Sequence, residues 1–117
     1  MLTYYGYKNC DTCRKAQKAL KAATVDFDDR DITTDPPSRS VLAAALKSGY
    51  AISDLFNKSG VLYREMKMKD KIKVTPEAEL LDLLAANGKL IKRPIVTDSK
   101  RFTVGYKEDA FAAAWCQ

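Results

Sequence analysis

The sequence contains 117 residues, of which 46% are hydrophobic and 30% charged, which suits one folded domain and argues against long disordered segments. It contains no histidine, which excludes Ser–His–Asp catalysis, Cys–His catalysis and histidine-ligated metal sites. The formal net charge of +5 favours anionic partners but is too small to predict nucleic-acid binding.

The first predicted elements are a strand, a helix and a second strand. Leu2–Gly6 is short, aromatic and β-branched, as strands are. We expect Asp11 or Thr12 to cap a helix that runs to about Ala23, because apolar residues recur there at steps of three and four. Val25–Phe27 begins the second predicted strand, and an acidic stretch follows it.

The middle of the chain reads as helical. Pro36-Pro37 marks a boundary before a helix that ends near Gly49, and Ser53 is a candidate cap for a short helix. Val61–Lys73 predicts a helical turn and a loop. Thr75-Pro76-Glu77 is a helix start, with Asn87-Gly88 predicted as its left-handed cap.

The end of the chain predicts two strands and a helix. Ile95–Thr97 and Phe102–Val104 are β-like, Asp98–Arg101 joins them as a tight hairpin, and Glu108 opens the last helix. The order predicts an α/β fold with one mixed four-stranded sheet and an all-helical insertion. We expect residues 1–117 to form a single domain, with its core at about 1–35 and 89–117 and the insertion at about 36–88.

The most informative local feature is Cys10-Asp11-Thr12-Cys13, which follows a strand and opens a helix. The positive end of the helix dipole and its free N–H groups favour a thiolate. Geometry predicts Cys10 as the exposed nucleophile and Cys13, one turn further, as the buried resolving thiol. The alternatives are two unreactive thiols, or a zinc site that would need about two further ligands.

Other residues have weaker signals. Arg93 precedes Pro94 at a strand start, so the bond before Pro94 is a candidate for the cis form. Arg93 is a candidate for binding an oxyanion, and the alternative is that it is an exposed residue at the edge of the strand. The basic run around Lys67–Lys73 fits a solvated face better than a nucleic-acid site. Cys116, next to the last residue, is expected to be a surface thiol.

The sequence also favours a particular compartment. Residues 1–8 lack the pattern of a signal peptide, and the longest apolar runs, such as Val41–Leu46, are too short to span a membrane. Three cysteines do not suggest a secreted disulfide scaffold. We therefore expect a cytoplasmic protein without membrane partners, metal or cofactor.

Three motifs in order resemble the arsenate reductase (ArsC) and Spx family of bacteria: Tyr5–Ala16 around the cysteines, Leu90–Val96 with its Arg-Pro, and Val104–Asp109. The resemblance covers nearly the whole chain and implies a thioredoxin-like fold with a helical insertion. In the reductases, one cysteine attacks arsenate and arginines hold the oxyanion. The resemblance assigns these roles to Cys10 and Arg93, and places Pro94 and Asn9 in the same oxyanion or substrate site.

The sequence departs from the reductases at Asn57-Lys58-Ser59-Gly60, where Ser59 stands at the family's arginine position. Ser59 is kept as a substrate-site candidate, and Lys58 offers a point charge instead of a planar fork. Losing a charge-assisted hydrogen bond weakens anion binding by about 1.5–3 kcal/mol. The second departure is Cys13, which the resembled glutaredoxin-dependent reductases do not need and Spx-type regulators use in a redox switch.

The leading hypothesis is therefore a thiol–disulfide oxidoreductase of the arsenate reductase family, with arsenate as a candidate substrate that is reduced to arsenite. Glutathione with glutaredoxin, or thioredoxin, is the expected electron donor. The alternative is an Spx-like regulator that binds the C-terminal domain of the RNA polymerase α subunit. Neither reading predicts direct DNA binding.

Overall fold

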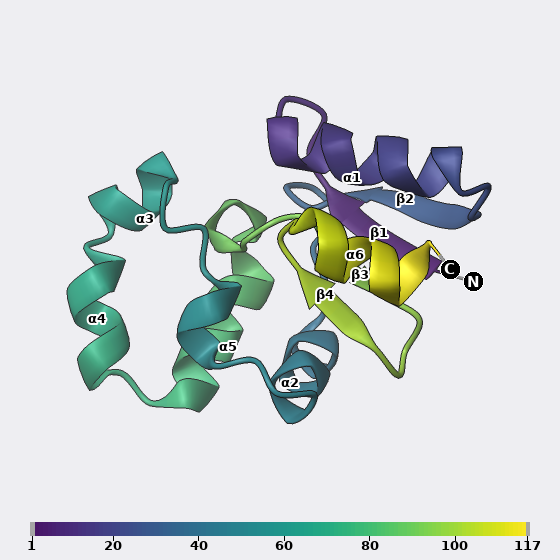
Figure 1. Cartoon of the computed structure of the whole chain (residues 1–117). Coiled ribbons are helices and arrows are strands. Elements are labelled where there is room, and N and C mark those ends of the chain that lie inside the picture. The colour runs from purple at the N-terminus through teal and green to yellow at the C-terminus, as the bar shows by residue number, and fades with distance from the viewer. Residues whose placement is uncertain (1, 117) are drawn as a thin grey trace. The chain divides into compact units, whose positions relative to one another are not determined.

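The computed structural model describes residues 2–116 and divides into two compact units. The first unit extends up to Asp31 and resumes at Arg93, and the second comprises Ile32–Lys92. The described residues of the first unit form four strands and two helices: β1 (Leu2–Gly6), α1 (Asp11–Ala22), β2 (Phe27–Asp31), β3 (Ile95–Thr97), β4 (Phe102–Val104) and α6 (Glu108–Trp115) (Figure 1). The expectation of a single domain stays a prediction.

The four strands form one mixed sheet in the order β2-β1-β3-β4. β1 pairs with β2 in parallel, with Leu2 opposite Phe27, and with β3 in antiparallel register, with Tyr4 opposite Val96. β3 and β4 form the antiparallel hairpin. The mixed four-stranded sheet predicted from the sequence is confirmed.

One face of this sheet is covered by α1 and α6. The buried cluster combines residues of the sheet and of both helices: Leu2, Tyr4, Val96, Cys13, Ala16, Leu20, Phe111 and Trp115. Cys13, Ala16 and Leu20 lie on one helical stripe at steps of three and four, which is the periodicity that predicted α1. This packing fixes α1 beneath the end of β1, where the cysteine motif begins.

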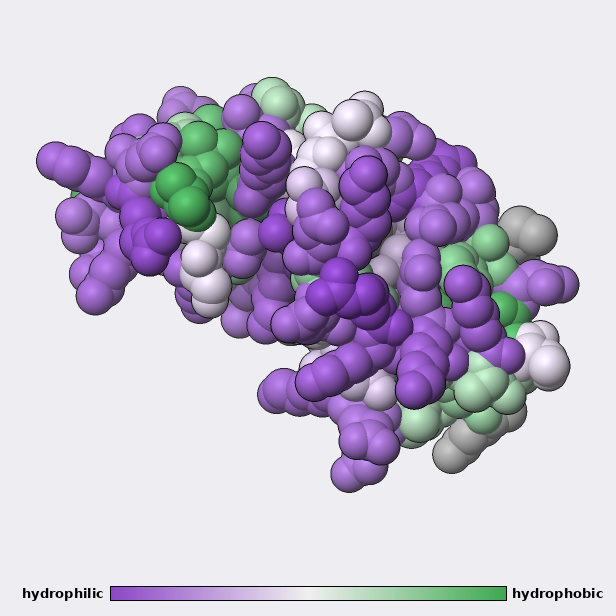
Figure 2. Space-filling model, turned by 90° about the horizontal axis from the view of Figure 1, so that it is seen from above, coloured by the Kyte–Doolittle hydropathy of each residue, from purple (hydrophilic) through white to green (hydrophobic). Residues whose placement is uncertain are grey.

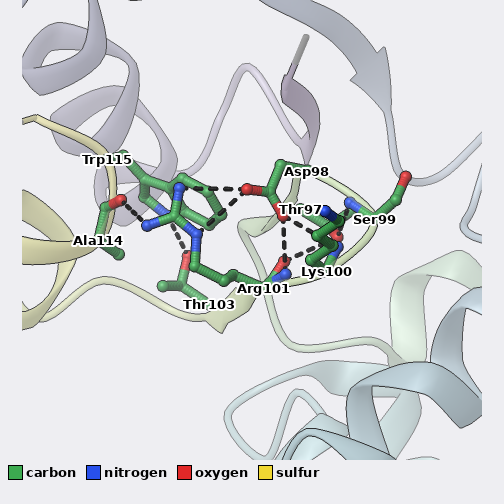
Figure 3. Close-up of polar contacts among 8 residues, drawn as sticks. All are labelled: Thr97, Asp98, Ser99, Lys100, Arg101, Thr103, Ala114 and Trp115. Carbon is green, nitrogen blue, oxygen red and sulfur yellow. Dashed lines mark hydrogen bonds and ion pairs between the residues drawn. The ribbon is translucent and has the colours of Figure 1, made fainter.

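The β3–β4 hairpin is tied to the end of α6 (Figure 3). The Asp98 carboxylate accepts hydrogen bonds from the backbone N–H groups of Lys100 and Arg101, at 2.9 and 2.7 Å. The Arg101 guanidinium pairs with that carboxylate, donates to the Ala114 carbonyl at 2.8 Å and lies over the Trp115 ring. A single arginine thus connects the turn to the last helix.

The second unit is helical. Its elements are α2 (Arg39–Lys47), the 3-10 turn η1 (Ile52–Leu55), α3 (Val61–Glu65), α4 (Met68–Val74), α5 (Glu77–Ala86) and the 3-10 turn η2 (Gly88–Leu90). Phe56 and Ile91 form an isolated β-bridge. Arg39 of α2 pairs with Asp82 of α5 at 2.7 Å.

Several local predictions were wrong in detail. The acidic residues after Phe27 form β2 itself, because pairing with β1 outweighs the low strand propensity of aspartate. Val61–Lys73 holds most of two short helices, and Lys67 between them adopts a left-handed conformation with φ of 53°. Asn87 has φ of −136°, and Gly88 leads directly into η2 rather than forming a left-handed cap.

Gly88 is required for a different reason. A Cβ atom at this position would lie 1.8 Å from the Ile32 carbonyl oxygen, so only glycine permits the close approach of the two backbones. Glycine is therefore required at this position, because of a close backbone contact inside the second unit and not because of a left-handed cap.

The surface is mainly hydrophilic on the face that Figure 2 shows, with hydrophobic residues in small patches. Within residues 2–116, the exposed large hydrophobic side chains are Val61 and Val74, both in the second unit. None of the helices described combines the length and hydropathy that a membrane span requires.

Candidate functional site

Cys10 is itself the N-cap of α1. Its backbone is extended, with φ of −115° and ψ of 117°, and its sulfur accepts a hydrogen bond from the Cys13 backbone N–H at 3.3 Å. The prediction that Asp11 or Thr12 caps this helix was therefore wrong. The reactive-residue candidate occupies the position where the helix directs its free N–H groups.

The surroundings of Cys10 favour its thiolate. Burial of this half-exposed thiol by itself raises its pKa, but hydrogen bonds from the Cys13 side chain and backbone and from Arg93, together with the Arg93 charge, hold the pKa below its ordinary value. The Arg93 guanidinium also lies over the Tyr7 ring, 5.0 Å from its centre. This stacking restricts the motion of the guanidinium that hydrogen-bonds to Cys10.

Cys13 has the opposite character. Its side chain is 1% exposed, and burial raises its pKa to about 12. The hydrogen bond that its thiol gives to Cys10 and the negative charge of Cys10 contribute to this same rise. Both cysteines are free thiols in this structure. The pair therefore combines an accessible thiol that ionises readily with a buried thiol that does not.

The Arg93–Pro94 peptide bond is cis, as the sequence had suggested it could be. Pro94 is buried at the start of β3, and its carbonyl accepts a hydrogen bond from the Gly105 N–H at 2.8 Å. Arg93 is thereby attached to the rigid sheet. The structure thus brings Arg93 to Cys10 and places Pro94 next to Arg93 at the start of the strand.

Asn9 lies in the turn immediately before Cys10, and its side chain is exposed. Asp11, whose charge opposes a thiolate at Cys10, forms an ion pair with Arg14. Arg14 also donates a hydrogen bond to the Lys8 carbonyl at 2.9 Å. The exposed turn therefore leaves Cys10 approachable, with the carboxylate of the adjacent Asp11 already paired.

Ser59 belongs to the second unit. It is exposed and lines a cavity of about 160 Å³ with Asn57, Lys58 and Lys92 among its walls. The Asn57 backbone N–H donates to the Leu90 carbonyl at 2.7 Å, which fixes the start of this loop. The cavity is lined by two lysines and by the carboxylate of Asp54, and Lys92 is a residue that sequence reasoning did not single out for the site.

Two tyrosines near the cysteines also escaped the sequence analysis. The Tyr4 hydroxyl donates to the Cys13 carbonyl at 3.0 Å, and the Tyr7 backbone hydrogen-bonds to the Cys13 sulfur and lowers its pKa. Tyr4 and Gly6 project to the same face of β1, because side chains two residues apart do so in a strand. The sequence feature that could have indicated this role is a tyrosine two residues before a glycine, in the strand that precedes the cysteine motif.

A cavity of about 280 Å³ lies beside Cys13. Tyr4, Gly6 and Tyr7 line it from β1 and the following turn, and Asp29 and Asp31 line it from β2. The cavity is therefore on the Cys13 side of the motif, whereas Arg93 is the partner of Cys10.

Cys116 does not join the pair. It is half-buried, and its thiol donates to the Ala19 carbonyl at 3.7 Å, near the other end of α1. The expectation of an exposed terminal thiol was wrong because the residue packs against the core cluster. No group of three cysteine or carboxylate side chains suited to a metal occurs in the described part of the chain.

The basic run lies on and beside α4. Lys67, Lys69, Lys71 and Lys73 are all exposed. Asp70 lies among them, in the first turn of the same helix. This arrangement agrees with a solvated helix face.

Comparisons with known proteins give a consistent result. The model of the ArsC family matches residues 5–114. The chain is 45% identical to the uncharacterized protein YusI of Bacillus subtilis, covering 97% of this chain and 98% of YusI. It is 33% identical to the global transcriptional regulator Spx of Streptococcus pyogenes, covering 97% of this chain and 84% of Spx. The crystal structure of a possible arsenate reductase from Streptococcus mutans superposes with a TM-score of 0.86 at 38% identity, covering 92% of each chain.

Proposed function

The chain belongs to the ArsC family, and we propose that it is a thiol–disulfide oxidoreductase in which Cys10 is the nucleophile and Cys13 the resolving thiol. The observation that carries this proposal is the opposite tuning of the two thiols. The pKa of Cys10 is lowered, and that of Cys13 is raised to about 12. Cys10 therefore ionises more readily than Cys13, so Cys10 attacks the substrate and Cys13 reacts in the second step.

Cys10 attacks first, as a thiolate. The N–H groups at the start of α1 and the Arg93 guanidinium stabilise its negative charge. Once Cys10 is bonded to the substrate, the Cys13 sulfur attacks the Cys10 sulfur and displaces the reduced product. A Cys10–Cys13 disulfide remains, and an external thiol system, glutaredoxin with glutathione or thioredoxin, reduces it in the cytoplasm.

Arsenate is the substrate that we propose first. Cys10 replaces one oxygen of arsenic acid, which leaves as water, and forms a sulfur–arsenic bond. Attack by Cys13 then breaks this bond, and the electron pair stays on arsenic. Two thiols are oxidised to one disulfide and As(V) is reduced to As(III), so the oxidation and reduction balance. Arg93 would hold the oxyanion, with Pro94 and Asn9 as further site residues of the first unit, and the family resemblance adds Ser59 from the second unit.

The experiment measures arsenate-dependent consumption of NADPH by the pure protein. It is coupled in parallel to glutathione–glutaredoxin and to thioredoxin, with Cys10→Ser as the blank. Turnover above the blank supports the reductase and identifies its electron donor. No turnover with either donor contradicts arsenate as the substrate.

A second experiment tests the roles of the two thiols. Cys13→Ser treated with a small disulfide, oxidised glutathione, is expected to keep one glutathione on Cys10 as a mixed disulfide, which intact-protein mass spectrometry detects as an adduct. The wild-type protein is expected to release this glutathione and to lose two mass units as its disulfide forms. A Cys13→Ser variant without adduct and with the wild-type rate would contradict the resolving role.

The similarity to Spx supports a second candidate function. Spx is 33% identical over nearly all of this chain, and the Cys-x-x-Cys motif could act as a redox switch. The candidate is a regulator whose Cys10–Cys13 disulfide controls binding to the RNA polymerase α C-terminal domain. A pull-down with that domain, with and without reductant, tests it. Failure to retain the domain in either state would argue against this function.

A further inference from the structure

Tyr4 places a hydroxyl group inside the core directly beneath the cysteine motif. Its side chain is 1% exposed, and the hydroxyl donates to the Cys13 carbonyl at 3.0 Å. The Tyr4 ring also packs against Phe27, with 5.4 Å between ring centres. The apolar contacts would serve a phenylalanine equally well, so the hydroxyl is the part of this side chain that packing does not explain.

Gly6 makes room for that hydroxyl. A Cβ atom at Gly6 would lie 2.4 Å from the Tyr4 oxygen and 2.5 Å from the nearest ring carbons, which is too close for any side chain. Gly6 is not among the residues with positive φ, so backbone conformation does not require glycine here. The Tyr4 hydroxyl can therefore occupy the space beside Cys13 because residue 6 is a glycine and has no side chain there.

The Cys13 thiolate needs stabilisation in the resolving step, when Cys13 attacks the Cys10 sulfur. In the reduced pair, burial, the hydrogen bond to Cys10 and the charge of Cys10 all raise its pKa. When Cys10 is bonded to a substrate, its negative charge disappears, and burial remains. The groups that oppose burial are the Tyr7 backbone and the Tyr4 hydroxyl, which both lower the pKa of Cys13.

We propose that Tyr4 is a positioning residue for the resolving step, because its hydroxyl donates a hydrogen bond to the Cys13 sulfur as that sulfur becomes a thiolate. The hydrogen bond then shifts between the Cys13 carbonyl and the Cys13 sulfur. Tyr4 acts as a donor and not as a base, since burial raises its own pKa far above neutrality. This inference rests on the proposed function, because the step exists only if Cys13 resolves.

The proton and the electrons are accounted for. The Cys13 thiol releases its proton to solvent through the cavity of about 280 Å³ that both Tyr4 and Cys13 line. The thiolate then forms the S–S bond to Cys10 while the bond between Cys10 and its adduct breaks, and the adduct leaves with the electron pair. Tyr4 keeps its proton throughout and is unchanged at the end.

The titratable groups around Cys13 determine how the rate of the resolving step depends on pH. α6 presents apolar Phe111 and Trp115 to this cluster. The titratable or charged groups at the thiol and along the cavity are Cys10, Tyr4, Tyr7, Lys8, Arg14, Asp29 and Asp31. Between about pH 6 and 10, with Cys10 blocked by its adduct, Cys13 is the group whose ionisation starts the resolving step.

The test follows the two sulfur steps separately with the aromatic disulfide dithiobis(nitrobenzoate), added at one equivalent to protein carrying Cys116→Ser. Attack by Cys10 releases one coloured nitrothiobenzoate anion, and attack by Cys13 releases the second. We expect Tyr4→Phe to leave the first phase unchanged and to slow the second about ten-fold or more, the usual effect of losing a hydrogen bond to a charged group. The pH midpoint of the second phase should rise.

Two further variants sharpen the test. Tyr106→Phe removes a hydroxyl from a tyrosine that packs on Phe111 in the same cluster, and it should change neither phase. Gly6→Ala should slow the second phase by displacing the Tyr4 ring. It should have little further effect on that phase in the Tyr4→Phe background, where the hydroxyl is already absent.

The outcomes separate the inference from the proposed function. A second phase of equal rate and equal pH midpoint in wild type and Tyr4→Phe would overturn the inference and leave the resolving role intact. Equal slowing of both phases by Tyr4→Phe would also overturn it, since that indicates a general disturbance of the fold. A wild-type protein that releases only the first anion, like Cys13→Ser, would refute the proposed function itself.

Discussion

The Cys13 backbone N–H lies 3.3 Å from the Cys10 sulfur, so the first cysteine caps the helix that contains the second. The two residues are coupled through this contact as well as through their thiols. Any chemistry that changes the charge of Cys10 also changes the cap of α1. The function proposed for the pair and the stability of the helix can therefore be tested with the same substitutions.

Substitutions of Cys10 should separate its chemical role from its role as the cap of α1. Cys10→Ser retains an oxygen that can accept the Cys13 N–H, whereas Cys10→Ala removes the cap and should lower the free energy of unfolding by about 1 kcal/mol. Both variants should be chemically inactive. Urea denaturation followed by circular dichroism measures the difference, and equal stability of the two variants would contradict a capping role for residue 10.

Arg93→Gln should make Cys10 less reactive. The guanidinium holds the pKa of Cys10 down, so the thiolate persists to lower pH in the wild type than it would without Arg93. Loss of a charge-assisted hydrogen bond should reduce the alkylation rate by iodoacetamide near neutral pH by about ten-fold or more. The rate-against-pH profile should move to higher pH. Lys15→Gln, which removes an exposed charge from the same helix, should leave the profile in place.

Ser59→Arg should improve turnover of arsenate. The family resemblance places an arginine at this position, and Ser59 lines a cavity that also contains Lys58 and Lys92. A restored planar cation should lower the KM for arsenate by about ten-fold or more, because a hydrogen bond to a charged group contributes about 1.5–3 kcal/mol. Ser59→Lys is the matched control, since it adds charge without the fork. An unchanged KM in Ser59→Arg would argue for another substrate.

Asp98→Asn should weaken the β3–β4 hairpin. The backbone N–H groups of Arg101 and Lys100, with the Arg101 guanidinium, lower the pKa of Asp98 to about 2 (Figure 3). Its unfolded pKa is about 3.9, so the stabilisation is complete above about pH 4 and disappears as the pH falls through about 2. We expect a loss of about 1 kcal/mol at pH 7, as for other capping carboxylates. Unfolding measured from pH 7 to pH 2 should show a smaller acid dependence in the variant.

Much of the fold could be predicted because its signals are local. Leu2–Gly6, Ile95–Thr97 and Phe102–Val104 were predicted with the bounds that the structure shows. β2 was harder, since its aspartates disfavour strands and only pairing with β1, a non-local contact, makes it one. Gly88 illustrates the same limit, because its nearest contact is with Ile32, far away in the sequence.

The candidate site also contains residues that the local sequence predicts and residues that depend on non-local contacts. Cys10 and Cys13 could be recognised from their spacing and their place at a helix start, and the family resemblance added Arg93. Which thiol ionises more readily followed from position along the helix. The contribution of Tyr4 did not, because it depends on the register of β1 against α1 and on the space left by Gly6.

The acidic sequence of β2 has a consequence for association between copies of the chain. β2 is an edge strand of the sheet, and its backbone alternates between groups paired with β1 and groups directed outward. Such an edge can recruit a strand from another molecule and start aggregation. Asp28, Asp29 and Asp31 are exposed along it and Arg30 pairs with Asp28, so the edge carries a net negative charge that repels a second copy of itself. The residues that make β2 hard to recognise as a strand thereby keep it from adding a neighbour.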